Sequence, residues 1–183
     1  LYYYAKKSDF KNFQKIISKY YLDHSDNSFA LTFIRLQTEN LVFKDLQTYI
    51  FIKNAWYKQD KECYQLQAMI TKELDKVVEE KIFDLGQRIF AEQKKDNCDN
   101  DIIDNLHAKR DTFIKMSKNI RSASGCKNIS KKVMQLLSVE DFENVEFDNM
   151  PDILPFKTQY YDLTSGELKY YKASNYVLTK LSY

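Results

Sequence analysis

The chain has 183 residues, of which 44% are hydrophobic, and a formal net charge of +2. This length and composition are typical of a folded domain that can bury a real core. No apolar run is long enough to cross a bilayer, so we expect no membrane partner. Three widely spaced cysteines without a CxxC pair indicate an intracellular, reducing compartment rather than a disulfide framework or a metal site.

Helical spacing of apolar residues dominates the start of the chain. Ser8 and Asp9 predict the start of a first helix, in which Phe, Ile and Tyr recur every three or four residues as far as Tyr20. A second helix is predicted from Asn27 or Ser28, with its apolar stripe beginning at Phe29. Three Gly and two Pro in the whole chain also favour long helices over a many-turned β-sandwich.

The spacing then changes to short runs of β-branched and aromatic residues. Leu41–Phe43, Thr48–Ile52 and Trp56–Tyr57 predict a small antiparallel meander near residues 41–57. Trp56 and Tyr57 have the chemistry to stack on a nucleic-acid base. A tryptophan in a short sheet is more often a core residue, and we expect the core role here.

Helical spacing returns from Cys63 to about Lys94, and Gly86 is expected to end or bend this helix. The acidic segment 96–101 lacks the central glycine and terminal glutamate of a calcium loop, so a solvated loop is expected. A helix is predicted from Ile102 to Ile120, a break at 122–125, and a further helix from Asn128 to Leu137. Ser138 and Asp141 then resemble the start of a short capped turn.

The C-terminal part is predicted to be extended. Pro151 and Pro155 disfavour helix, and a turn at 164–167 separates two aromatic runs, which predicts a hairpin near residues 154–171. The fold class expected for the whole chain is therefore α+β and mostly helical, with this hairpin and the meander as its β-structure.

No sequence motif carries catalytic chemistry. The chain has no GxxxxGK[ST] phosphate loop, no GxGxxG and no HExxH, and its two histidines are far apart in sequence. We therefore expect no enzymatic activity, no catalytic or metal-binding residue and no bound cofactor in this chain.

Charge is strongly segregated along the sequence. Residues 108–135 contain eight basic residues and one acidic residue, which gives this block a charge of +7. Lys115, Lys118 and Arg121 recur every three residues on a predicted helix, which suits a row of phosphate contacts. The candidate DNA-binding residues are Lys109, Arg110, Lys115, Lys118, Arg121, Lys127, Lys131 and Lys132. The alternative is a solvated face, or one offset by the acidic run 140–148.

Two stretches resemble one known family. The first runs from Ala30 to Tyr57 and contains the strand pair with Trp56. The second contains Leu154-Pro155-Phe156-Lys157, Tyr161-Asp162-Leu163 and Thr164-Ser165-Gly166-Glu167. Their order resembles the domain that precedes the superfamily-3 AAA+ motor in poxvirus-type primase–helicases and related phage and giant-virus replication proteins. At Thr158-Gln159-Tyr160 this family usually has Asn-Gly-Val, so we expect a different turn there.

This resemblance implies a helical lead-in at residues 1–27 and a collar-type domain at 28–183. It also implies a non-catalytic role in a viral-type DNA helicase: help in assembling a hexameric ring, guidance of DNA to a downstream ATPase motor that uses ATP and magnesium, and linkage to an upstream primase. The basic block itself predicts weak, sequence-independent DNA binding. Leu1 in place of a starting methionine suggests an excerpt of such a parent chain. Two alternatives remain open, a protein-interaction or oligomerisation module without nucleic-acid contact and an accessory domain of an enzyme unrelated to DNA.

Overall fold

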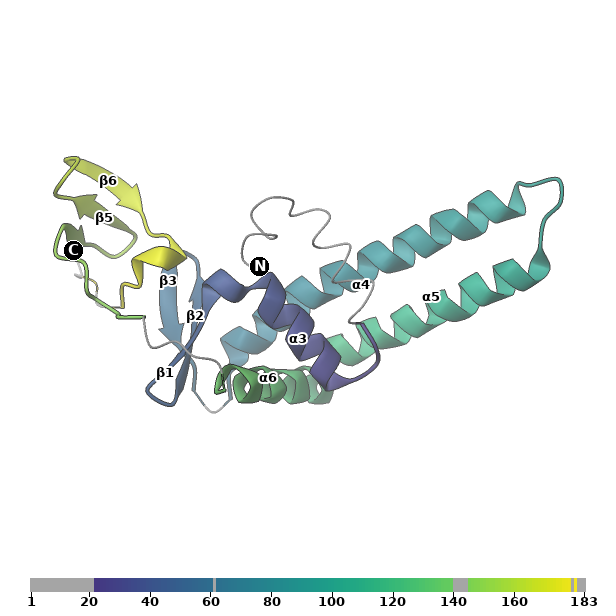
Figure 1. Cartoon of the computed structure of the whole chain (residues 1–183), viewed down its shortest axis with the longest axis horizontal. Helices are drawn as coiled ribbons and strands as arrows, with labels where there is room; N and C mark the ends of the chain where they lie inside the picture. Colours follow the sequence, from purple (N-terminus) through teal and green to yellow (C-terminus); the bar gives the residue numbers. More distant parts are fainter. Residues whose placement is uncertain (1–21, 61, 140–144, 179, 181–183) are drawn as a thin grey trace. The chain divides into compact units, whose positions relative to one another are not determined.

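The computed structural model describes residues 22–60, 62–139, 145–178 and 180. Within these ranges the chain forms four α-helices and two three-stranded antiparallel sheets, which confirms the predicted α+β class (Figure 1). The helix predicted from Ser8 lies outside the described residues. Contacts divide the chain into two compact units. The first unit comprises the residues up to Leu36 together with Gln67–Val133, and the second comprises Gln37–Leu66 and Met134–Tyr183.

The first helix of the structure, α3 (Asp26–Leu36), starts close to the predicted position. The Ser25 hydroxyl accepts a hydrogen bond from the Ser28 amide at 3.1 Å, which satisfies one of the unpaired amides at the helix start. Phe29 and Phe33 are fully buried, as the predicted apolar stripe requires.

Helices α4 (Tyr64–Gln93) and α5 (Asn100–Arg121) run antiparallel, side by side, as a long hairpin (Figure 1). Buried Leu85 and Ile89 on α4 form one cluster with Ile103 and Leu106 on α5. Gly86 was predicted to end or bend this helix. It does not end the helix, because α4 continues for seven residues beyond Gly86. One glycine costs a helix about 1 kcal/mol, and the burial of Leu85 and Ile89 on either side outweighs that cost.

The last helix, α6 (Ala123–Leu137), starts five residues earlier than predicted. The predicted break at 122–125 is reduced to Ser122, whose backbone is extended. The reason is capping: the Ser122 hydroxyl accepts from the Gly125 amide at 3.0 Å, which lets the new helix begin at once.

The predicted meander is confirmed in the second unit as β1 (Leu41–Lys44), β2 (Gln47–Ile52) and β3 (Ala55–Lys58), paired in that order. A 3₁₀ turn, η1 (Thr38–Asn40), precedes it. The two-residue turns at 45–46 and 53–54 have positive φ at both positions, which is the backbone of type I′ hairpin turns. The aspartate and asparagine in these turns tolerate that backbone better than most residues do.

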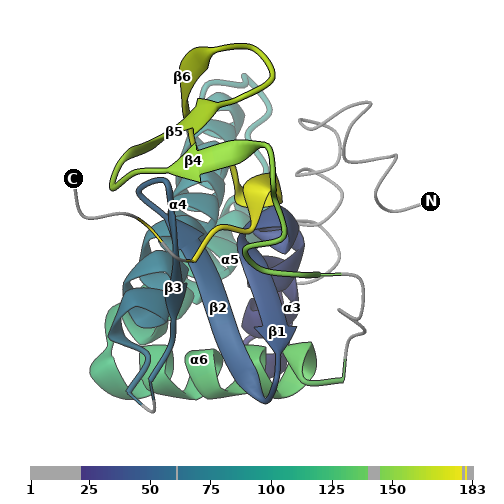
Figure 2. The same cartoon turned by 90° about the vertical axis from the view of Figure 1, so that its left-hand side faces the viewer.

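The second sheet consists of β4 (Ile153–Pro155), β5 (Gln159–Asp162) and β6 (Glu167–Tyr170), followed by the 3₁₀ turn η2 (Ala173–Asn175) (Figure 2). The predicted hairpin is present and gains a third strand, because the extended chain at β4 pairs with β5. One face of this sheet packs through Tyr160 and Ile153 into a small core with Tyr171, Val177 and Phe51 of β2.

Candidate nucleic-acid interface

All eight predicted DNA-binding residues lie on α5 or α6, within the first compact unit. The Asp99 carboxylate caps α5 by accepting from the amides of Asp101 and Ile102, at 2.9 and 3.3 Å. The buried residues of α5, which include Leu106, Met116 and Ile120, recur at helical spacing and fix its inner side. The exposed positions of α5 include Lys109, Lys115 and Lys118.

The structure distinguishes among the eight residues by exposure. Arg110 and Lys132 are half-buried, and Arg110 Nε is buried without a hydrogen-bond partner among the described residues. The exposed members are Lys109, Lys115, Lys118, Arg121, Lys127 and Lys131. Within the described ranges, Lys109, Lys115, Lys118 and Lys131 make no ion pair within 4.0 Å.

Arg121 differs from its neighbours because α4 already binds its guanidinium group. Its Nε lies 3.0 Å from both carboxylate oxygens of Asp75, and its Nη2 lies 2.7 Å from Asp75 Oδ2 and from Glu79 Oε1. The hydrogen bonds to Asp75 raise the pKa of Arg121. The Ser117 hydroxyl donates to the same carboxylate at 2.9 Å. Arg121 therefore joins α4 to α5, and the predicted row retains Lys115 and Lys118.

The corner between α5 and α6 is held by Ser122 and Gly125. Ser122 closes α5 through its amide, which donates to the carbonyls of Lys118 and Asn119, and its hydroxyl caps α6. A Cβ atom on Gly125 would lie 2.1 Å from the Asn119 carbonyl oxygen. Gly125 is thus needed for close approach of the two helices, although its own backbone is helical. The sequence prediction missed this role because a glycine among serines is also typical of a loop.

The outer face of α6 is polar and contains no carboxylate. Its exposed side chains include Ser124, Lys127, Asn128, Lys131 and Gln135, while Ile129 and Val133 are fully buried on the opposite face. No Asp or Glu occurs between Ala123 and Leu137. The outer face of α6 therefore presents positive charge and hydrogen-bonding groups to solvent without an acidic neighbour on its own helix.

Trp56 belongs to the core of the second unit, as expected. Its side chain is 5% exposed, and its indole N–H donates to the Ala173 carbonyl oxygen at 3.1 Å. The ring stacks on Tyr176 at a centroid distance of 5.6 Å and meets Phe147 edge-on. A buried ring with both a hydrogen bond and aromatic neighbours has no face left for a base.

Asp162 fixes the β5–β6 turn. Its carboxylate accepts from the amides of Thr164 and Ser165, at 2.9 and 3.1 Å, and from Lys169 Nζ at 2.6 Å. The hydrogen bond from Lys169, together with those from the turn, lowers the pKa of Asp162 to about 2. Gly166 supplies the left-handed backbone of the turn, with φ of 69°.

The β4–β5 turn forms without a glycine. The Phe156 amide donates to the Gln159 carbonyl at 2.9 Å and closes a two-residue loop. None of Lys157, Thr158 and Gln159 has positive φ, so this turn needs no glycine.

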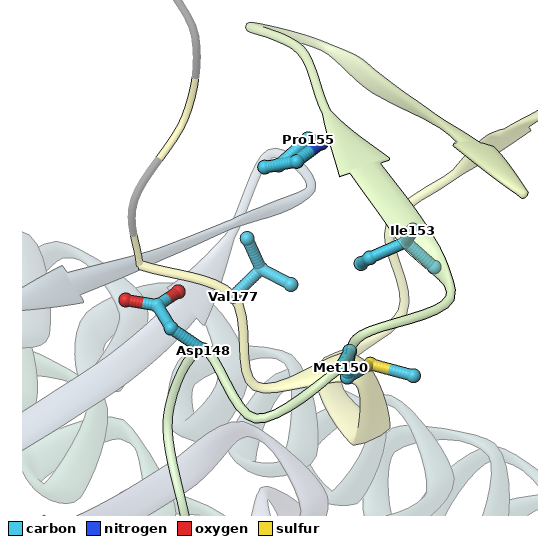
Figure 3. A pocket seen from close by; sticks show the side chains of 5 residues that line it. All are labelled: Asp148, Met150, Ile153, Pro155 and Val177. Atoms are coloured by element: carbon cyan, nitrogen blue, oxygen red, sulfur yellow. The ribbon is translucent and has the colours of Figure 1, made fainter. Parts of the chain in front are cut away.

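A cavity of about 190 Å³ lies beside β4, lined by Asp148, Met150, Ile153, Pro155 and Val177 (Figure 3). The Asp148 carboxylate accepts from the Leu178 amide at 2.8 Å, so it serves the local backbone. The other lining side chains are apolar, and the volume is below the roughly 300 Å³ of small-molecule sites. This cavity offers no convergent polar groups for a ligand.

Among the described residues, no three His, Cys, Asp or Glu side chains come close enough to hold a metal ion. The acidic segment 96–101 lines a shallow, open depression between α4 and α5. In the part of the chain that the structure describes, no helix combines the length and the hydropathy of a membrane span.

Comparison with known proteins identifies the family of the chain. No curated protein matches the sequence. A family model described as D5 N terminal like matches residues 14–183, which is nearly the whole chain and includes every element of the described structure. The chain therefore belongs to the D5 N-terminal-like family, the N-terminal region of D5-type primase–helicases.

Proposed function

We propose that this domain is a non-catalytic, DNA-handling part of a ring-forming replication helicase. In this proposal the cations of α5 and α6 contact DNA phosphates and guide the strand or duplex to an ATPase motor in the parent protein. The protomers would assemble into a ring, which the family resemblance implies is hexameric. Such a ring would multiply contacts that are weak in one protomer. The family membership supplies the replication context.

The observation that carries the proposal is the outward placement of Lys115, Lys118, Lys127 and Lys131 on two adjoining helices. Lysines that reach phosphates release counterions, so affinity falls steeply with salt and is independent of sequence. Phosphate contacts of this kind position a protein on DNA without reading its bases.

The test is charge reversal at those four lysines in the full-length parent protein. The matched control reverses four exposed lysines of the second unit, Lys53, Lys58, Lys157 and Lys172. We expect the first variant to bind DNA more weakly. The slope of log affinity against log salt should be flatter by about 0.9 for each duplex phosphate that the variant no longer neutralises. The control should keep both properties. Equal behaviour of the two variants would refute a specific DNA-contacting role for α5 and α6.

A second candidate function rests on the outer face of the β4–β6 sheet. The strand register places Leu154, Tyr161 and Leu168 in one cross-strand row, and Leu168 and Tyr170 lie on the same face of β6. Leu154, Leu168 and Tyr170 are 44%, 58% and 64% exposed. An apolar face of this kind favours a protein-interaction or oligomerisation role, which is compatible with DNA contact on the other unit.

A further inference from the structure

The α5–α6 surface is the solvent-facing side of the two helices that carries Lys115, Lys118, Lys127 and Lys131. The side chains present on this surface, and those absent from it, indicate which class of ligand it binds. We infer that this surface binds the sugar–phosphate backbone of duplex DNA, with the outer face of α6 at its centre, and does not hold an unpaired strand by its bases. This inference rests on the proposed DNA-contacting function and adds to it the strand form and the principal helix.

The first argument is the absence of a stacking platform. Proteins that hold single strands without sequence preference combine a basic groove with aromatic side chains on which successive bases stack. Phe113 is the only Phe, Tyr or Trp in α5 and α6, and it packs against the core of the helical hairpin. The exposed aromatic residues described in the first unit, Phe83 and Phe90, lie on α4, and Lys94 covers the Phe90 ring. Among the residues that the structure describes, the lysines of α5 and α6 thus have no exposed aromatic side chain on their own helices of the kind that single-strand binding uses.

The second argument is the distribution of acidic residues. Helix α5 contains Asp101, Asp104 and Asp111, and Arg121 at its end is bound by two carboxylates of α4. Helix α6 contains none, and its exposed Lys127 and Lys131 are one turn apart on the same side. A DNA phosphate approaching the outer face of α6 meets lysines and no carboxylate of that helix, and the helix dipole adds a partial positive charge at its N-terminus.

The third argument concerns the geometry of the supporting elements. Ser122 and Gly125 leave no flexible linker between α5 and α6, and the Arg121 ion pairs attach the end of α5 to α4. The lysines therefore project from helices with a fixed mutual orientation. The two backbones of a duplex present a higher charge density to such lysines than one strand does.

The experiment compares three fluorescent probes of equal length, about 20 nucleotides: a duplex, a thymidine strand and an abasic strand that lacks bases. Binding of the full 183-residue chain is followed by anisotropy over a salt series. We expect the duplex to bind at least about fivefold more tightly than either single strand, with the thymidine and abasic strands equal within about twofold.

Three variants locate the contact. K127E/K131E should weaken duplex binding by about tenfold or more. The slope of log affinity against log salt should become flatter by the amount expected for the loss of roughly two phosphate contacts. K58E/K157E, which changes the net charge equally, should leave both values unchanged. F83A/F90A, which removes the exposed aromatic rings of α4, should bind all three probes as the parent chain does.

Two failures are distinguishable. If K127E/K131E weakens binding while the thymidine strand binds more tightly than the duplex and the abasic strand, then DNA contact stands and the duplex inference is wrong. If no probe responds to K127E/K131E, the DNA-contacting function of this surface is itself refuted. Weaker thymidine-strand binding by F83A/F90A would also overturn the inference, because it would reveal base stacking on α4.

Discussion

Arg121 of α5 and Asp75 of α4 form a two-pronged ion pair, with Nε and Nη2 of the guanidinium both bonded to the carboxylate at 2.7 to 3.0 Å. The planar guanidinium matches a carboxylate in this arrangement better than a lysine would. The pair joins residues 46 positions apart in the chain, and Glu79 and Ser117 extend it into a network. Arg121 is thus a structural residue at the base of the helical hairpin.

Replacing Arg121 by alanine should therefore affect stability more than DNA binding. We expect R121A to lower the melting temperature by a few degrees, the modest effect typical of an exposed ion-pair network. K118A, three residues earlier and without an ion pair among the described residues, should leave the melting temperature unchanged and weaken DNA binding. The reverse pattern, a stable R121A with reduced DNA affinity, would make Arg121 a phosphate contact after all.

Gly125 and Gly86 provide a matched pair of glycine-to-alanine substitutions in helices. At Gly125 the new Cβ would lie 2.1 Å from the Asn119 carbonyl oxygen, whereas at Gly86 nothing lies within 4 Å. We expect G125A to destabilise the chain by about 1–3 kcal/mol, as overpacking does. G86A should stabilise it by about 0.5–1 kcal/mol, because alanine is the better helix former. Urea unfolding measures both, and equal effects would contradict the tight α5–α6 corner.

Asp162 gives a pH-dependent contribution to stability with a defined direction. Its pKa in the folded chain is about 2, below the value of 3.8 for an ordinary aspartate, mainly because of the hydrogen bond from Lys169. A carboxyl group whose pKa is lowered on folding stabilises the fold above its unfolded pKa, and this contribution disappears as pH falls. The decrease should occur between about pH 4 and pH 2.

The measurement is the urea midpoint of the parent chain and of D162N as a function of pH. We expect D162N to be less stable at neutral pH and the two curves to converge as pH falls towards about 2. D152N, at an exposed aspartate just before β4, should run parallel to the parent over the whole range. A constant gap between parent and D162N over this range would show that the Asp162 charge is not responsible.

Trp56 is the only tryptophan of the chain, so its fluorescence reports on one site. Because the ring is buried, we expect a blue-shifted emission, weak quenching by iodide, and no change when DNA is added. W56A should cost about 3–5 kcal/mol of stability, as large-to-small core substitutions do. Quenching of the emission by an added single strand would indicate base stacking on Trp56 instead.

Much of the fold was predictable because local patterns agree with it. The period of apolar residues placed the two long helices and the 41–57 meander, and the segment 164–167, which contains Gly166, marked the last turn. The type I′ turns also formed without glycine, at Asp45-Leu46 and Lys53-Asn54, because the strands on either side determine the backbone there.

The remaining features depend on contacts between segments distant in sequence. The third strand β4 exists because β5 pairs with it, which no local period reveals. The role of Arg121 is set by Asp75, and the requirement for Gly125 is set by the end of the preceding helix. Helical spacing alone placed Arg121 in a row with Lys115 and Lys118, since it cannot show which cation a neighbouring helix binds.

The central claim is that α5 and α6 form the DNA-contacting face, and backbone amide shifts during titration with a duplex test it most directly. We predict progressive shifts at Lys115, Lys118 and the exposed residues of α6 from Lys127 to Gln135, which disappear at high salt. The β4–β6 sheet should remain unperturbed. Shifts centred on Leu154, Leu168 and Tyr170, with α6 unchanged, would contradict the account.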